Sequence, residues 1–166
     1  QKTSDRLWSI DFLLNLLTAH FLFASYSLLY TVVPLYILYL QGREWHVGII
    51  VGSLGLAGIF VRPLSGRAIH RLGPKRVVMT GLAFFATGSL LFVPAGGVWW
   101  LLPARLFQGI GMGMSPVATS TIVANLAPAR RRAEGLGYMG NSIALSLIYG
   151  PLLGFWLYTT VGFQAT

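Results

Sequence analysis

Five long apolar runs constrain the fold of this sequence more than any other feature. They cover residues 12–40, 45–65, 77–93, 98–126 and 135–161. A helix that crosses the hydrocarbon core of a membrane needs about 20 apolar residues, so runs of this length suit membrane spans. The runs are continuous rather than alternating, which excludes barrel-type strands. The sequence therefore predicts an all-α integral membrane protein with five transmembrane helices.

The few charged residues lie between these runs and predict their orientation. Only 10% of the residues are charged, yet the formal net charge is +8. Nine of the twelve Lys and Arg fall on one side of the predicted membrane, two before residue 10, four in 66–76 and three in 127–134, whereas Arg43 alone marks the other side. The positive-inside rule places the N-terminus in the cytoplasm. The positive charge is thus explained by membrane orientation. We expect the lipid bilayer as a partner and do not expect nucleic acid.

Several kinds of chemistry are excluded by what the sequence lacks. It has no cysteine, so disulfides and thiolate metal sites are excluded. It has no GxSxG elbow, HExxH motif, Walker loop or pair of acids within a run, so we expect neither an enzyme nor a metal site or cofactor. The sequence begins with Gln1 and ends without a charged tail at Thr166. We expect a piece of a longer chain.

Three polar residues inside the runs are candidates for function. Burying Arg105 in a membrane costs at least about 2.5 kcal/mol, so it must face a cavity, water or a partner unless its side chain snorkels outward. Gln108 lies three residues on and shares its helix face. His20 lies about 14 Å into the first run, near the membrane midplane. It either titrates and carries protons or packs as a neutral residue, and the sequence leaves both open.

Glycines recur at spacings that favour close helix packing. They are Gly48, Gly52 and Gly55 in the second run, Gly109 and Gly113 in the fourth, and Gly150 and Gly154 in the fifth. In the fifth run Gly150 also precedes Pro151, which removes a backbone hydrogen bond. We therefore predict a tight bundle with a bend at this dipeptide.

Three motifs in the matching helices together resemble the first half of the Major Facilitator Superfamily fold, which has twelve helices. Residues 62–76 are similar to the family's cytoplasmic loop motif, G-x-x-x-D-R-x-G-R-K. The residues that match in kind are Gly66, Arg71, Gly73, Lys75 and Arg76. His70 replaces the acid that helps to latch the cytoplasmic side in the family. The resemblance thus implies a cytoplasmic gate whose latch is weakened, altered or pH-dependent in this chain.

The other two motifs lie in the fourth and fifth runs. The stretch from Arg105 through Gln108 to Gly111 resembles the family's R-x-x-Q-G-x-G motif, whose arginine is associated with proton coupling. The stretch from Gly137 to Phe155 resembles the antiporter motif of drug-export branches, except that Ser146 and Phe155 stand where glycine is usual. The partial motif of the fifth run favours proton-coupled export.

The resemblance implies a transporter of the plasma (inner) membrane, powered by a proton gradient. It would work by alternating access between two six-helix halves, the second of which is missing here. Its substrate would be a small apolar or cationic molecule that is exported. Arg105 would be a coupling or structural charge, and Gln108 and His20 polar groups of the cavity. An uptake symporter of the same fold is one alternative, and a non-transporting membrane scaffold or intramembrane enzyme is another.

Overall fold

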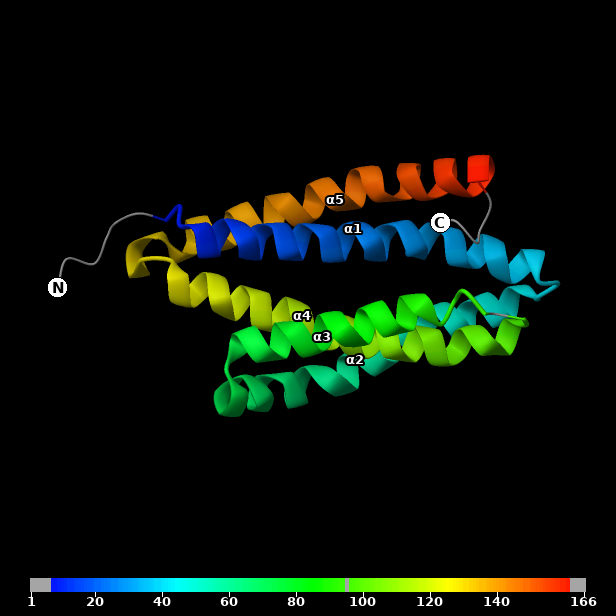
Figure 1. Cartoon of the computed structure of the whole chain (residues 1–166), viewed down its shortest axis with the longest axis horizontal. Coiled ribbons are helices and arrows are strands. Elements are labelled where there is room, and N and C mark those ends of the chain that lie inside the picture. Colours follow the sequence, from blue (N-terminus) through cyan, green and yellow to red (C-terminus); the bar gives the residue numbers. More distant parts are fainter. Residues whose placement is uncertain (1–6, 95, 162–166) are drawn as a thin grey trace.

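The computed structural model describes residues 7–94 and 96–161, and these fold almost entirely into helices (Figure 1). The helices are α1 (Ile10–Tyr39), α2 (Glu44–Leu72), α3 (Pro74–Leu90), α4 (Leu101–Leu126) and α5 (Arg132–Val161). Single 3₁₀ turns, η1 (Val98–Trp100) and η2 (Ala129–Arg131), precede α4 and α5. The described residues contain no strand, and the all-α prediction is confirmed.

The second helix is longer than the sequence suggested. It continues to Leu72, so the loop predicted over 66–76 is wrong, and Gly73 alone separates α2 from α3. Gly73 adopts a φ of +84°, which a residue without a side chain tolerates, and Pro74 then begins α3 with its fixed φ. Residues 66–72 include Arg67, His70 and Arg71 but no proline, so the helix can continue through them. The residues predicted to form the gate therefore lie at the end of α2 and at the α2–α3 junction.

Three of the helical segments are long and apolar enough to cross a membrane: Ile10–Tyr39, Glu44–Leu72 and Ala129–Thr160. The two other helices, α3 and α4, fall short for different reasons. The 17 residues of α3 are about 25 Å long at 1.5 Å per residue. The α4 helix is long enough, but Arg105, Gln108 and four hydroxyl residues reduce its hydropathy. That α3 and α4 cross the membrane therefore stays a prediction. It is supported by their position beside the longer apolar helices.

The α4 helix holds the bundle together. It packs closely against α2 and α3, while α1 and α5 run side by side as a second group (Figure 1). A Cβ atom added to Gly113 would lie 2.9 Å from the Gly58 carbonyl of α2. One added to Gly154 would lie 2.8 Å from the Leu28 carbonyl of α1. The predicted close packing is therefore confirmed for the glycines of α4 and α5.

The glycines of α2 behave differently. A Cβ atom added to Gly48, Gly52 or Gly55 would meet nothing within 4 Å among the described residues. The prediction that this stripe packs tightly is therefore wrong for the described chain. The α2 helix instead approaches α4 with the face that carries Leu54 and Gly58. Spacing alone cannot distinguish a covered stripe from an open one.

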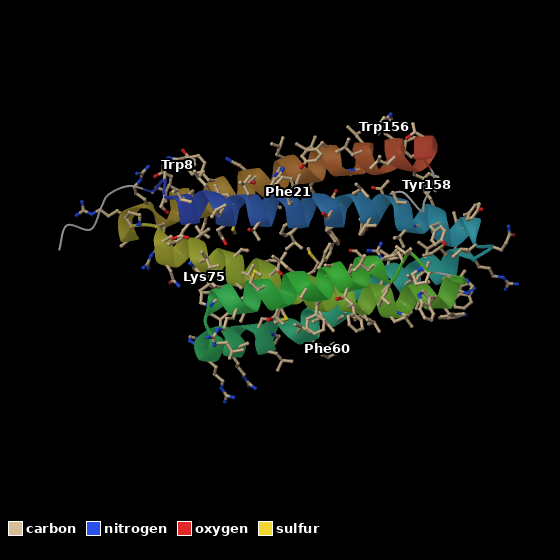
Figure 2. All side chains as sticks on the ribbon, in the orientation of Figure 1. Trp8, Phe21, Phe60, Lys75, Trp156 and Tyr158 are labelled. Atoms are coloured by element: carbon tan, nitrogen blue, oxygen red, sulfur yellow. The ribbon has the colours of Figure 1, made fainter. Side chains whose placement is uncertain are left out.

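Basic residues gather at one end of the bundle. The start of α1, the α2–α3 junction and the α4–α5 connection all lie at this end, which we call the basic end (Figure 1). Lys75 and Trp8 lie there, whereas Trp156 and Tyr158 lie at the opposite end (Figure 2). Arg43 lies between α1 and α2 at that opposite end. This arrangement brings the separate basic segments of the sequence together at the basic end.

Candidate functional site

Arg105 is fully buried between helices and does not snorkel. It exposes 1% of its surface. Its Nη1 donates to Oε1 of Gln108 at 3.0 Å, and its Nη2 donates to the Leu29 carbonyl of α1 at 3.1 Å. Its guanidinium carbon lies 5.7 Å from the centre of the Phe92 ring, within the range of a cation–π contact. The side chain therefore joins α4 to α1.

Gln108 extends this network to α3. Its Nε2 donates to Oγ of Ser89 at 3.0 Å, and that hydroxyl donates to the Phe85 carbonyl at 3.0 Å. Gly88 permits this close approach of α3 and α4, since a Cβ atom there would lie 2.7 Å from the backbone nitrogen of Gln108. Gln108 exposes 0% of its surface. Arg105 and Gln108 thus form one polar chain through α1, α4 and α3, buried inside these five helices.

The charge of Arg105 has no acidic partner within the described residues. The carboxylates there are Asp11, Glu44 and Glu134, each in the first turn of its helix. The Nε atom of Arg105 also has no hydrogen-bond partner in the described part of the chain. A buried arginine that is held only by neutral groups costs free energy, and membrane proteins retain such groups mainly for function. The network is therefore the strongest candidate site on α4.

A second polar cluster joins α1 to α5 around His20. The Nδ1 atom of His20 lies 2.8 Å from the Ser142 carbonyl oxygen, and Nε2 lies 2.6 Å from the Tyr149 hydroxyl. The Ser142 hydroxyl also approaches Nδ1, at 3.3 Å. The imidazole is half-buried, and the ring centres of His20 and Tyr149 are 5.6 Å apart. Both ring nitrogens therefore have partners on the neighbouring helix.

The residues predicted to form a cytoplasmic gate lie at the basic end. His70, Arg71, Lys75 and Arg76 are exposed, and a Cβ atom added to Gly66 would meet no atom of the described chain within 4 Å. Lys75 lies 3.7 Å from a carboxylate oxygen of Asp11, with 77% and 60% of the two side chains exposed. An ion pair this exposed contributes little to stability. Asp11 nevertheless brings a negative charge from α1 to a motif that lacks its own acid.

The Gly150–Pro151 dipeptide lies in the contact between α5 and α1. A Cβ atom added to Gly150 would lie 2.7 Å from Cβ of Ser27. The α5 helix runs through Pro151 to Val161. Because proline has no N–H, the carbonyl of Leu147 lacks its usual helical donor. The predicted bend stays a prediction, and the structure shows that this weak point of α5 faces α1.

Sequence reasoning missed the partners that complete both clusters. Leu29 and Ser89 reach Arg105 and Gln108 from other helices, and no local spacing reveals such contacts. Ser142 and Tyr149 are seven residues apart, which places both on one face of α5, so this face could have been recognised as polar. Asn15 is also buried and donates to the Thr119 carbonyl at 3.1 Å, which joins α1 to α4.

Comparison with known proteins identifies the family. A family model described as the Major Facilitator Superfamily matches residues 7–166. The chain belongs to the Major Facilitator Superfamily. This membership confirms the resemblance found in the sequence and, with the apolar helices, identifies a multi-pass membrane protein of a transporter family. Both polar clusters lie within the matched residues.

Two curated bacterial proteins are similar to the chain. Quinolone resistance protein NorA of Staphylococcus aureus is 26% identical over 133 residues, which are 80% of this chain and 34% of NorA. Multidrug resistance protein 1 of Bacillus subtilis is 30% identical over 117 residues, which are 70% of this chain and 30% of that protein. The chain spans about a third of the length of these relatives.

Proposed function

We propose that this chain is the first part of a transporter that exports a small molecule in exchange for protons. The observation that carries the proposal is its similarity to two members of the superfamily that are named for resistance to quinolones and to multiple drugs. A membrane transporter can confer resistance by removing a compound from the cell. We infer the same direction of transport here, with a small apolar or cationic molecule as substrate.

The proposed mechanism is alternating access between this helical bundle and a second half. The relatives are about three times as long as the matched region, which supports the existence of further helices in the whole protein. The substrate would bind near the membrane midplane, between the two halves. Export against a gradient needs an energy source, and we propose the proton gradient. No cofactor or enzymatic step is part of the proposal.

We propose that Arg105 is the coupling charge. Its guanidinium joins α1 to α4 and Gln108 joins α4 to α3, so movement of any one of these helices would disturb hydrogen bonds to a buried charge. Such bonds are stronger than neutral ones and hold helices in defined positions. His20 and Gln108 are the polar groups that this half contributes to the transport route.

We further propose the orientation and the gate. The basic end would face the cytoplasm and the N-terminus would lie there, in the plasma membrane, because positively charged connections are retained on that side. The gate would consist of Gly66, His70 and Arg71 at the end of α2, with Gly73, Lys75 and Arg76 at the start of α3. The weak point at Gly150 and Pro151 would allow α5 to bend against α1.

The direction of transport can be tested in inside-out membrane vesicles that contain the full-length protein and are acidified internally by respiration. The probe is a fluorescent quinolone. Export predicts that the vesicles accumulate the probe and release it when the proton gradient is collapsed. Loss of preloaded probe on energisation would instead indicate an uptake symporter. If neither this probe nor a fluorescent lipophilic cation moves, the transport proposal fails and the scaffold alternative stands.

A further inference from the structure

The His20 cluster has a chemistry that the Arg105 network lacks. Both polar chains cross between helices, but the arginine side chain stays protonated in proteins, whereas histidine changes charge between pH 5 and 8 when its surroundings do not perturb it. His20 lies ten residues past the start of α1, about 15 Å along the helix, which places it well inside the predicted membrane. An ionisable group at this depth is a candidate proton carrier.

The hydrogen bonds of His20 define which nitrogen can bind a proton. The Ser142 carbonyl, 2.8 Å from Nδ1, can only accept a hydrogen bond, so Nδ1 must carry a hydrogen. In the neutral imidazole Nε2 is then an unprotonated acceptor, and the Tyr149 hydroxyl donates to it across 2.6 Å. The neutral state of the cluster is therefore fully hydrogen-bonded.

The same geometry also accommodates the protonated state. A proton added to Nε2 forms an N–H bond, and the Tyr149 hydroxyl turns so that its oxygen accepts from this new donor. No covalent bond of the chain breaks, the added proton comes from water, and Nδ1 keeps its bond to the Ser142 carbonyl. A hydroxyl can serve in both states because it is both donor and acceptor. Tyr149 is thus suited to stabilise His20 before and after protonation.

The charged groups around His20 are distant along both helices. Asp11 precedes His20 by nine residues on α1, which is about 14 Å along the helix. Arg105 of α4 donates to the Leu29 carbonyl, and Leu29 follows His20 by nine residues, again about 14 Å along α1. On α5, Glu134 lies eight residues before Ser142. The titratable group facing the imidazole from α5 is the Tyr149 phenol itself. These described charges are therefore each separated from His20, or from its partner Ser142, by more than two helical turns.

We propose that Nε2 of His20, paired with the Tyr149 hydroxyl, is the site in this half that binds the transported proton. Protonation places a positive charge in the contact between α1 and α5. Tyr149 directly precedes Gly150 and Pro151, where α5 lacks one helical hydrogen bond and touches Ser27 of α1. The positive charge would therefore appear in the α1–α5 contact beside the point where α5 lacks a backbone hydrogen bond. This inference rests on the proposed function and names its proton site.

The test separates proton coupling from folding in the full-length protein reconstituted in liposomes. Two fluxes of a fluorescent quinolone are measured: transport driven by an imposed pH gradient, and exchange of labelled for unlabelled probe at equal pH. The His20→Asn variant keeps an N–H donor for the Ser142 carbonyl but cannot titrate. We expect it to retain exchange and to lose gradient-driven transport by about tenfold, a typical coupling factor.

Two further variants complete the design. Tyr149→Phe keeps the ring but removes the acceptor of the protonated state, so we expect gradient-driven transport to require a more acidic pH. His46→Asn is the matched control, because His46 caps α2 through the Arg43 nitrogen at 2.9 Å and belongs to neither cluster. We expect both of its fluxes to equal those of the wild type.

Three outcomes would overturn the inference. One is gradient-driven transport that persists in His20→Asn. Another is an equal loss of both fluxes in His20→Asn and Tyr149→Phe, which a packing role would produce. The third comes from ¹⁵N-histidine spectra, in which the His20 signal is the difference between the wild type and His20→Asn. The inference fails if this signal shows Nε2 unprotonated at every pH between 5 and 8. Absence of any flux in the wild type refutes the proposed function itself, whereas the histidine spectrum reports on His20 directly.

Discussion

The contact between Gly109 and α2 gives a quantitative prediction about the position of the Arg105 network. Gly109 directly follows Gln108, and a Cβ atom added to it would overlap the Leu54 carbonyl oxygen and lie 2.7 Å from Cβ of Ala57. Leu54 presents backbone atoms, which cannot rotate away as a side chain could. A Gly109→Ala variant must therefore push α2 and α4 apart.

The size of the effect follows from a comparison with an open glycine. Overpacking by one methyl group costs about 1–3 kcal/mol, whereas replacing a helical glycine with alanine gains at most about 1 kcal/mol. Gly52→Ala should show only this gain, because its Cβ would meet nothing within 4 Å among the described residues. We expect Gly109→Ala to be less stable than Gly52→Ala by about 1–3 kcal/mol, since the helix term cancels between the two variants.

The assay is unfolding of the purified protein in mixed micelles, followed by circular dichroism as a denaturing detergent is added. The two variants are compared with the wild type under identical conditions, so the difference between their midpoints reports the packing cost. If Gly109→Ala proved as stable as Gly52→Ala, the close approach of α2 and α4 would be refuted.

Other variants probe the remaining contacts. Arg105→Lys keeps the charge but cannot reach both Gln108 and Leu29, so gradient-driven quinolone transport should fall about tenfold or more, as expected for losing one charged hydrogen bond. Asn15→Ala removes the bond to the Thr119 carbonyl and should lower stability by about 1 kcal/mol in the micelle titration. Asp11→Asn breaks an exposed pair and should leave that midpoint within about 0.5 kcal/mol of the wild type. Residues 1–166 alone, in liposomes, should show no saturable flux.

The helices themselves could be predicted because each apolar run is a local property of the sequence. The predicted and observed ends differ by a few residues, except at α2, which runs to Leu72 rather than residue 65. The positive charges after Ser65 indicated where a membrane ends, and a helix can continue beyond that boundary. At Gly73 the sequence did carry the signal, since a glycine followed by proline is typical of one helix ending and another beginning.

The candidate site could be predicted only in its local part. Arg105 and Gln108 are three residues apart on one helix; the structure confirms that they share a face and shows in addition a hydrogen bond between them. Their partners Leu29 and Ser89, and the Tyr149 partner of His20, come from other helices. Glycine spacing failed for the same reason: Gly52 and Gly109 have similar local patterns, but within the described part of the chain a Cβ atom would meet a neighbour only at Gly109. Contacts of this kind depend on tertiary packing.

Simultaneous recording of proton and quinolone movement tests the central claim most directly. The full-length protein is reconstituted in liposomes that contain a pH-sensitive dye, and an outward gradient of the quinolone is imposed with no initial pH gradient. Proton-coupled exchange predicts that the lumen acidifies as the quinolone leaves, and that His20→Asn reduces the acidification by about tenfold. Efflux of the quinolone with no change in luminal pH in the wild type, or with alkalinisation, would contradict the account.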